Sequence, residues 1–403
     1  MALSLRDLTP RQWHTVAACY LGWTLDAFDF FILVFVLKDV AATFGTDIKA
    51  VTMAITFTLA MRPVGALLFG VLADRFGRRP VLMANVLAYS FLEFASGFAP
   101  TLTAFIILRA LYGVAMGGEW GVGASLAMES IPVKMRGLVS GLLQTGYPSG
   151  YLFASLVFYF LFPLIGWRGM FMVGIIPAFL VMYIRRTVDE SPAFAAEIKA
   201  EKTDGLLPQI KKNWGLFVWA IVMMTSFNFL SHGTQDMYPT FLEKQRALDT
   251  HSVSVIAIIY NIGAILGGLF FGTLSNKIGR RRAIVIAALC ALPVIPLWTH
   301  AKTTAGLALG AFLMQFFVQG AWGVVPAHLT ELSPDAVRGS FPGVAYQLGN
   351  LLASYNATLQ ATIAHNLDGD YAFALAAVAG IVAVILALVV GFGREARDHK
   401  FIP

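Results

Sequence analysis

The chain has 403 residues, of which 58% are hydrophobic and 13% are charged, whereas soluble domains carry about 25% charged residues. This composition excludes a water-soluble protein, because the hydrophobic residues also fall in runs of about 20, each long enough to cross a bilayer core as a helix. The formal net charge of +6 does not indicate nucleic-acid binding, since the positive residues gather in loops on one side of the predicted helices.

Twelve hydrophobic segments follow one another along the chain. Residues 1–12 lack the short apolar core and cleavage site of a signal peptide, so the first segment is expected to stay in the mature protein. Cys19 and Cys290 both lie inside apolar runs, which indicates packing and not a disulfide. The predicted spans are 14–37, 48–72, 80–99, 101–127, 138–163, 168–186, 214–239, 251–275, 283–300, 303–329, 338–364 and 371–393.

An even number of spans puts both termini on the same side of the membrane. Most of the 29 Lys and Arg residues fall in the loops on that side. Because cytoplasmic loops carry the excess of positive charge, we expect both termini in the cytoplasm. The predicted location is therefore the plasma membrane, as a multi-pass protein of a bacterial inner membrane.

The longest loop divides the chain into three parts. Residues 1–186 are expected to form an N-terminal six-helix bundle, 187–213 a charged cytoplasmic linker, and 214–403 a C-terminal six-helix bundle with a short tail. All other loops are short, so no room remains for a soluble catalytic domain. Neither a nucleophile with its base nor a complete set of metal ligands is present, which predicts a protein that is not an enzyme and has no cofactor.

The two halves repeat each other at an offset of 202 residues. Gly70-Val-Leu-Ala-Asp-Arg-Phe-Gly-Arg-Arg79 reappears as Gly272-Thr-Leu-Ser-Asn-Lys-Ile-Gly-Arg-Arg281. The same offset superimposes Gly118, Trp120, Glu129 and Arg136-Gly137 on Gly320, Trp322, Glu331 and Arg338-Gly339. Two homologous halves in parallel orientation predict a transporter whose substrate site lies between them, near the middle of the membrane.

These residues resemble a known family. The segment from Gly70 to Arg79 resembles the loop signature of the major facilitator superfamily, and Arg109 followed by Gly113 and Gly117-Gly118 resembles its fourth-helix signature. The resemblance implies an all-α integral membrane protein with 12 transmembrane helices in two pseudo-symmetric six-helix bundles. It also implies a conformational latch at Asp74, Arg78 and Arg280, weaker in the second copy because Asn276 replaces the aspartate.

A second resemblance is narrower. Residues 228–240, Asn-Phe-Leu-Ser-His-Gly-Thr-Gln-Asp-Met-Tyr-Pro-Thr, resemble the signature of the lactate and pyruvate:proton permeases, a branch of the sialate:proton symporter family. The segment from Leu25 to Phe31 is similar to the first helix of the same family. The implied function is proton-coupled symport of small monocarboxylates by alternating access. Since the chain lacks the long hydrophilic termini of fungal members, sialic acid or another organic acid anion stays open as the substrate.

Charged residues inside the predicted spans must pair or face water, because a charge exposed to lipid is costly. Arg109 is expected to bind the substrate carboxylate, since its planar guanidinium stays charged and matches a carboxylate. The alternative is an ion pair with Glu93, Glu119 or Asp26. Asp26 and Glu119 are candidates for proton coupling or for a structural role, whereas Arg62 is interpreted as mainly structural.

A polar stripe follows the seventh predicted span, since Asn228, His232, Gln235 and Asp236 recur at helical spacing. We expect the first three to contact substrate and Asp236 to take part in proton coupling, although such stripes also join helices to one another. Further candidate substrate residues are Gln347, Asn350 and Tyr147. The expected partners are a small organic acid anion, a proton and the lipid bilayer, with no nucleic acid and no metal, and the monomer is expected to be functional.

Overall fold

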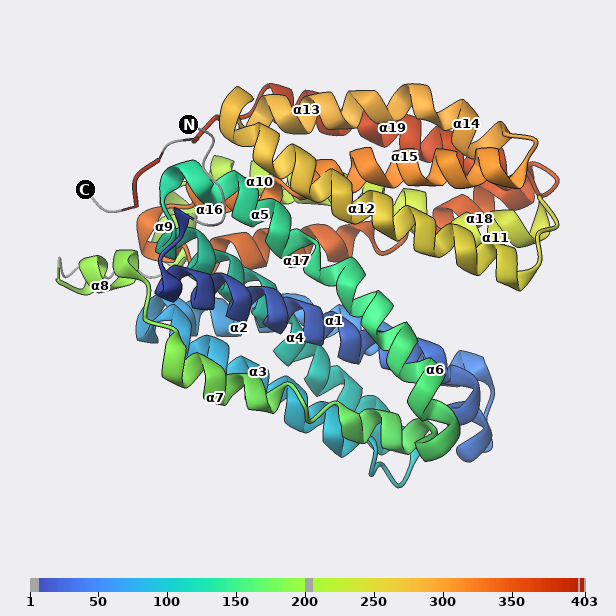
Figure 1. Cartoon of the computed structure of the whole chain (residues 1–403), viewed down its shortest axis with the longest axis horizontal. Helices are drawn as coiled ribbons and strands as arrows, with labels where there is room; N and C mark the ends of the chain where they lie inside the picture. Colours follow the sequence, from blue (N-terminus) through green and yellow to red (C-terminus); the bar gives the residue numbers. More distant parts are fainter. Residues whose placement is uncertain (1–6, 200–205, 398, 402–403) are drawn as a thin grey trace.

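The computed structural model describes residues 7–199, 206–397 and 399–401, and this part of the chain contains helices and loops but no strand. The helices form two bundles that lie side by side (Figure 1). In the first half the helices are α1 (Pro10–Thr43), α2 (Ile48–Phe76), α3 (Arg78–Ser96), α4 (Leu102–Ser130), α5 (Arg136–Gln144), α6 (Gly146–Val173) and α7 (Ala178–Thr187). Between the halves lie α8 (Pro192–Lys199) and α9 (Leu206–Lys212).

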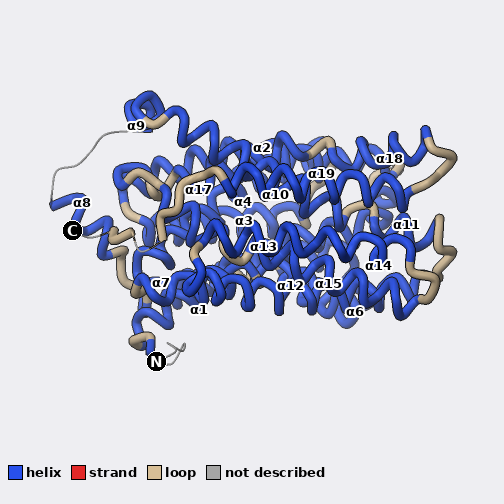
Figure 2. The backbone as a smooth tube through the Cα atoms, turned by 90° about the horizontal axis from the view of Figure 1, so that it is seen from above, coloured by secondary structure: helices blue, strands red, loops and turns tan. Residues whose placement is uncertain are grey.

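The second half follows the same plan. Its helices are α10 (Trp214–Gln235), α11 (Tyr238–Lys244), α12 (Thr250–Ile278), α13 (Arg280–Ala291), α14 (Ile295–His300), α15 (Thr304–Trp322), α16 (Val325–Leu332), α17 (Phe341–Ala353), α18 (Asn356–Asn366) and α19 (Tyr371–Gly391). Three short 3-10 turns link α4 to α5, α13 to α14 and α16 to α17. The first and last described parts of the chain lie at the same end of the molecule, which we call the terminal end (Figures 1 and 2).

Local sequence signals set where the long helices begin and reverse. The side chains of Thr9, Asp47 and Thr101 each accept a hydrogen bond from the first turn of α1, α2 and α4, which satisfies backbone donors that a helix start leaves unpaired. The turn between the fifth and sixth predicted spans is at Gly166, whose φ of 63° is readily adopted by glycine. α6 therefore contains the end of one crossing segment and the start of the next.

Nine segments of the described chain are long and apolar enough to cross a membrane. Three of the twelve predicted spans, 80–99, 168–186 and 338–364, are not among these nine segments as separate helices. α3 begins with two arginines and contains Glu93, the short α7 follows a break at residues 174–177, and α17 and α18 are separated by a turn at Ser354–Tyr355. Polar residues and helix breaks lower the mean hydropathy or the length of these segments, although the fold places them beside the apolar ones.

The structure repeats at the offset seen in the sequence. α2 and α12 begin and end 202 residues apart, as do α4 and the pair α15–α16. Gly77 and Gly279 end α2 and α12 with φ of 103° and 101°, a conformation that favours glycine. Each half also has a close approach between backbones, Gly65 against Val114 in the first and Gly267 against Phe316 in the second.

The two halves meet mainly through glycine-lined contacts near the terminal end. Gly70 at the end of α2 lies against Ser340 at the start of α17, and a Cβ at Gly70 would come 2.6 Å from the Ser340 Cα. Gly141 of α5 lies against Gly268 of α12, where a Cβ would come 2.4 Å from the Gly268 carbonyl oxygen. Because no side chain separates these backbones, the halves are closely joined at this end, while the ribbons diverge toward the other (Figure 1).

Candidate functional site

Arg62 of α2 lies where the two halves face each other. Its side chain donates a hydrogen bond of 3.4 Å to the Tyr346 hydroxyl of α17, and its guanidinium carbon lies 5.6 Å from the centre of that ring. The residue is only 4% exposed. Among the described residues no carboxylate pairs with it, and its Nε has no hydrogen-bond acceptor. A buried guanidinium in this state can take a carboxylate as an additional partner.

Aromatic rings surround this arginine and its tyrosine. The rings of Trp120 and Trp322, which are equivalent positions of the repeat, lie 4.8 Å and 5.4 Å from the Tyr346 ring. On the first half, Tyr147 stacks on Trp23 at 5.6 Å. Tyr147 also interacts electrostatically with Arg62 and Tyr346. Of the predicted substrate residues, Tyr147 is therefore one that the structure places beside the contact between the halves.

The polar stripe of α10 supplies the other side of the same region. His232 Nδ1 lies 3.1 Å from an Asp236 oxygen, and its Nε2 lies 3.0 Å from Asn350 Oδ1 of α17. The His232 and Asp236 side chains are both 38% exposed. Arg62 and His232 both contact α17, through Tyr346 and Asn350 respectively. We call Arg62, Tyr147, His232, Asp236, Tyr346 and Asn350 the central site.

Two other predicted residues of this stripe bond within the second half. Asn228 donates to the Met224 carbonyl at 2.7 Å, and Gln235 donates to Gln315 at 2.8 Å. The Gln235 contact joins α10 to α15, a role that polar residues also have between membrane helices, whereas the Asn228 bond lies within α10. The structure thus brings His232, Asp236 and Asn350 together, places Gln235 in a contact between α10 and α15, and buries Asn228 with a hydrogen bond to its own helix.

Gln347 is buried on the face of α17 that points to the centre. This face also carries Gly343, Tyr346 and Asn350, because residues three and four apart lie on one side of a helix. Gly343 approaches Gly121 of the first half, and Asn350 contacts His232. Neither amide atom of Gln347 has a hydrogen-bond partner in the described part of the chain.

Arg109, which was expected to bind the substrate carboxylate, lies outside the central site in this conformation. It forms an ion pair with Glu93 of α3, and both side chains are fully buried. Its guanidinium carbon lies 3.9 Å from the centre of the Tyr112 ring and 5.4 Å from that of Phe171. A carboxylate and two aromatic rings therefore surround the Arg109 charge inside the first half. This position agrees with the alternative stated from the sequence, an ion pair with Glu93.

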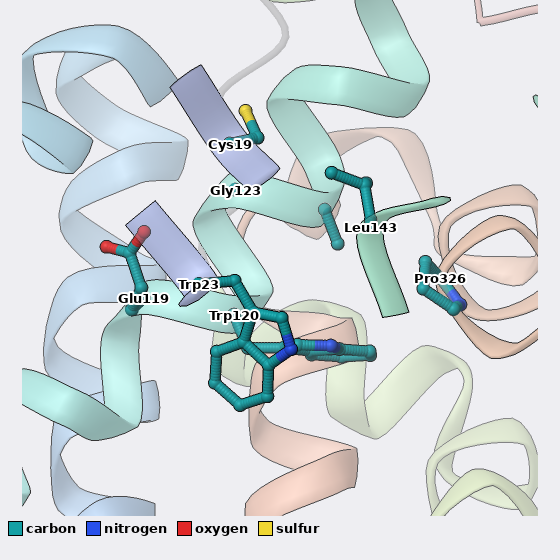
Figure 3. A pocket seen from close by; sticks show the side chains of 8 residues that line it. Cys19, Trp23, Glu119, Trp120, Gly123, Leu143 and Pro326 are labelled. Carbon is teal, nitrogen blue, oxygen red and sulfur yellow. The ribbon is translucent and has the colours of Figure 1, made fainter. Parts of the chain in front are cut away.

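Asp26 and Glu119 are also buried in the first half. Tyr112 donates to the Asp26 carbonyl at 3.0 Å and lies 3.5 Å from one of its carboxyl oxygens. The Glu119 oxygens contact no hydrogen-bonding group among the described residues. A small cavity lies beside Glu119, with room for about one water molecule. Figure 3 shows Glu119 and Trp120 projecting in different directions from α4, with Pro326 of the second half nearby.

At the terminal end, the predicted latch residues lie where the halves join. Asp74 of α2 accepts hydrogen bonds from the backbone N–H groups of Gly339 at 2.6 Å and Ser340 at 3.1 Å, just before α17 begins. Arg78 lies 3.6 Å from Asp74 and 3.2 Å from Glu129. Arg338 of the second half lies 3.3 Å from Glu129. We call Asp74, Arg78, Glu129 and Arg338 the first junction.

The equivalent residues form a second junction: Asn276, Arg280, Glu331 and Arg136. Asn276 accepts a hydrogen bond of 2.9 Å from the Gly137 N–H at the start of α5. Arg280 binds both oxygens of Glu331 at 2.9 Å. Arg136 of the first half lies 3.6 Å from Glu331. The pseudo-symmetry of the sequence therefore extends to the contacts between the halves.

Two glutamates that sequence reasoning missed stabilise these junctions. Glu190 accepts hydrogen bonds from the backbone N–H groups of Arg78 and Arg79 at the start of α3. Glu395 accepts one from the Arg281 N–H at the start of α13. A carboxylate is favourable at a helix N-terminus, although burial raises the pKa of the Glu190 carboxyl above its usual value. The available signal was an acidic residue shortly after the last helix of each half.

Comparison with known proteins identifies the family. Residues 19–249 match the family model of the Major Facilitator Superfamily, and residues 213–397 match that of the sugar (and other) transporters. A carboxylic acid transporter protein homolog of Saccharomyces cerevisiae is 30% identical over 98% of this chain and 70% of its own length. The chain belongs to the Major Facilitator Superfamily.

Other relatives of this transporter agree with that assignment. The sialic acid transporter NanX of Escherichia coli is 27% identical, with 98% of this chain and 97% of that protein covered. A crystal structure of a double tryptophan mutant of XylE matches with a TM-score of 0.80 at 19% identity, over 97% of each chain. The predicted all-helical major facilitator fold is thereby confirmed, as is the prediction of a multi-pass membrane transporter that is not an enzyme.

Proposed function

We propose that this transporter is a proton-coupled symporter of small monocarboxylates, with lactate and pyruvate as its substrates. The observation that carries the proposal is the buried Arg62, which lies between the halves without a carboxylate partner among the described residues. Support comes from relatives whose names specify organic acids, including the carboxylic acid transporter homolog and a cis,cis-muconate transport protein of Acinetobacter baylyi, 27% identical over 83% of each chain.

In this proposal Arg62 takes the carboxylate-binding role first expected of Arg109. Its planar guanidinium can bind both oxygens of a carboxylate, as a lysine cannot. His232 and Asn350 bind the rest of the substrate from the second half, with Tyr147 and Gln347 beside them. Gln235 acts indirectly, by fixing the position of α10 against α15. Because residues of both halves bind the substrate, a bound substrate couples the movement of one half to that of the other.

The carboxyl groups that we propose for proton coupling are those of Asp26, Glu119 and Asp236. Asp26 and Glu119 are buried with unpaired oxygens, and a buried carboxyl without partners is costly to keep charged. The Asp236 side chain is partly exposed and contacts His232. We infer that protonation of these groups accompanies the movement between states, with Asp236 receiving the proton from solvent. A monoanion moving with one proton carries no net charge, so uptake follows the pH gradient and responds little to membrane potential.

Alternating access then follows from the junctions. With the termini in the cytoplasm of a bacterial cell, the terminal end, where the halves are closely joined, faces the cytoplasm. Asp74, Arg78 and Arg280 act as the latch that holds this end closed, and substrate with a proton favours its release. The monomer contains both halves and is the functional unit.

The test is uptake of labelled lactate into proteoliposomes with an inward proton gradient, with unlabelled pyruvate and sialic acid as competitors. Arg62→Lys is expected to raise the KM for lactate about tenfold or more, because it loses the bidentate pairing. Arg109→Lys and the exposed Arg75→Lys are the matched controls, and both should keep a KM close to that of the wild type. An unchanged KM in Arg62→Lys would remove Arg62 from the site.

The second candidate substrate is sialic acid, because the similarity to NanX extends over nearly the whole of both chains. Sialic acid is also a monoanion, but it is larger and has many more hydroxyl groups. Lactate accumulation that pyruvate blocks and sialic acid does not would favour the first proposal. Accumulation of sialic acid in the absence of lactate uptake would favour the second.

A further inference from the structure

The two halves keep a tryptophan at equivalent positions but not its hydrogen-bond partner. In the first half, Trp120 Nε1 donates to Gln144 Oε1 at 3.3 Å. The residue 202 positions after Gln144 is Tyr346. Its ring meets the Trp322 ring nearly at right angles, and its hydroxyl accepts a hydrogen bond from Arg62 instead. By analogy with Trp120, Trp322 would be expected to donate a hydrogen bond to the residue at the position equivalent to Gln144. That residue is Tyr346, which does not accept one from Trp322.

Trp322 is left with a buried donor. The residue is 3% exposed, and its Nε1 has no acceptor among the described residues. Its ring is fixed between Tyr346 and Phe227, whose centres lie 5.4 Å and 5.3 Å away. Buried polar groups in folded proteins nearly always have a partner, and an indole N–H can only donate. The missing partner is therefore a hydrogen-bond acceptor.

Gln347 is a second buried polar group without a partner in the described chain, and it directly follows Tyr346. An amide both donates and accepts. Two unpartnered side chains thus lie next to the tyrosine that Arg62 contacts, on the half opposite Arg62. The Arg62 guanidinium carbon and the centre of the Trp322 ring lie 5.6 Å and 5.4 Å from the centre of the Tyr346 ring, so these groups are close enough to contact one small substrate.

We propose that Trp322 is a specificity-determining residue whose Nε1 donates to the oxygen on the second carbon of the substrate, the carbon bonded to the carboxylate. This inference rests on the proposed function and narrows its substrate class to 2-hydroxy and 2-oxo acids. Both a hydroxyl and a keto oxygen accept a hydrogen bond from Trp322. Gln347 accepts from the hydroxyl or donates to the keto group, so one site admits both.

The experiment compares lactate with propionate, which has the same carbon chain but no oxygen at the second carbon. Uptake into proteoliposomes is measured for the wild type, for Trp322→Phe and for Trp120→Phe. The first substitution keeps an aromatic ring and removes the N–H. The second removes an equivalent N–H that Gln144 already binds, and so serves as the matched control.

We expect the wild type to prefer lactate over propionate at least about tenfold, because an analogue that cannot pair a buried donor is disfavoured. Trp322→Phe should reduce this preference about tenfold while propionate uptake stays unchanged, and Trp120→Phe should keep it. A preference in Trp322→Phe equal to that of the wild type would overturn the proposal and show that the indole N–H serves packing or binds water. Failure of the wild type to take up lactate at all would instead contradict the proposed function.

A second variant covers the case in which Trp322→Phe does not fold. Replacing Trp322 by benzothienylalanine exchanges the N–H for sulfur and keeps the shape of the two-ring side chain. Binding of lactate and propionate to the purified protein, measured by calorimetry, needs no turnover. Loss of the lactate preference supports the role of Trp322, and an unchanged preference overturns it.

Discussion

The two junctions at the terminal end occupy equivalent positions of the repeat but join the halves with different chemistry. In the first, the Asp74 carboxylate accepts two backbone hydrogen bonds from Gly339 and Ser340. In the second, the Asn276 amide accepts one from Gly137. A charged acceptor at the start of a helix forms stronger hydrogen bonds than a neutral one. The first junction is therefore expected to contribute more to the closed state.

The junctions also differ in their balance of charge. The first contains two carboxylates and two guanidinium groups, whereas the second contains two guanidinium groups and the single carboxylate of Glu331. In the second junction, Arg136 has additional partners in place of a second carboxylate. It donates to the His399 carbonyl at 2.6 Å, and its guanidinium carbon lies 3.5 Å from the centre of the Phe401 ring. The tail residue Phe401 also lies 4.2 Å from the Arg338 guanidinium of the first junction. The chain thus completes its weaker junction with residues from outside the repeat.

The largest expected effect comes from Glu129→Gln. Glu129 holds both Arg78 and Arg338, so its loss leaves these buried guanidinium groups with Asp74 and Asp335 as their remaining carboxylate neighbours. Breaking a buried pair costs about 3–5 kcal/mol, and the closed terminal end should open. The measurement is a spin-label distance between Arg75→Cys and Lys277→Cys, two exposed equivalent positions, in a protein whose native cysteines are replaced by alanine. The distance should become longer.

Glu331→Gln is the matched comparison in the second junction. Glu331 binds Arg280 of its own half at 2.9 Å and Arg136 of the other half only at 3.6 Å. Its loss should therefore lower the thermal stability of the protein but lengthen the distance less than Glu129→Gln does. Equal lengthening in the two variants would contradict the difference between the junctions.

Asp74→Asn makes the first junction resemble the second. It removes the charge from hydrogen bonds to two backbone N–H groups, and hydrogen bonds to charged groups contribute about 1.5–3 kcal/mol. We expect a mixed population of short and long spin-label distances. A distribution identical to that of the parent protein would show that the carboxylate charge of Asp74 does not stabilise closure.

A smaller effect is expected from Phe401→Ala, which removes the ring next to Arg136 and Arg338. Interactions between a cation and an aromatic face contribute about 0.5–2 kcal/mol. The long-distance population should rise slightly, and less than in Asp74→Asn. Phe392→Ala is the control, because Phe392 is 87% exposed. An equal response of the two variants would mean that the tail does not contribute to closure.

Much of this architecture could be predicted from the sequence, because both signals that encode it are local. Hydrophobic runs mark helices, and glycines such as Gly77 and Gly279 mark the ends of α2 and α12. Because the sequence repeats at an offset of 202 residues, a helix or motif predicted in one half is also predicted at the equivalent position of the other half. It identified Glu129 and Glu331 as equivalent, although only the structure showed that they hold arginines of both halves.

The partner of each buried arginine could not be predicted in the same way. Arg62 and Arg109 both lie inside apolar helices, and either suits a carboxylate. Glu93 lies one helix earlier than Arg109, and the packing of α3 on α4 decides that these two meet. The partner of Arg62 is Tyr346, on the other half. Such contacts depend on packing between distant segments, which the spacing of residues along the chain does not specify.

The smallest expected effect has the opposite sign and gives the sharpest test of the comparison. Asn276→Asp places a carboxylate at the start of α5 and next to Arg280, which already lies 2.9 Å from the Asn276 oxygen. A negative charge at a helix N-terminus contributes about 0.3–1 kcal/mol, so the population of the closed state should increase. If opening limits the rate of transport, lactate uptake should become slower. Combined with Asp74→Asn, it should restore part of the short-distance population, because the carboxylate has moved from one junction to the other. Restoration would show that closure depends on the total charge at the two helix starts, whereas its absence would assign closure to the first junction alone.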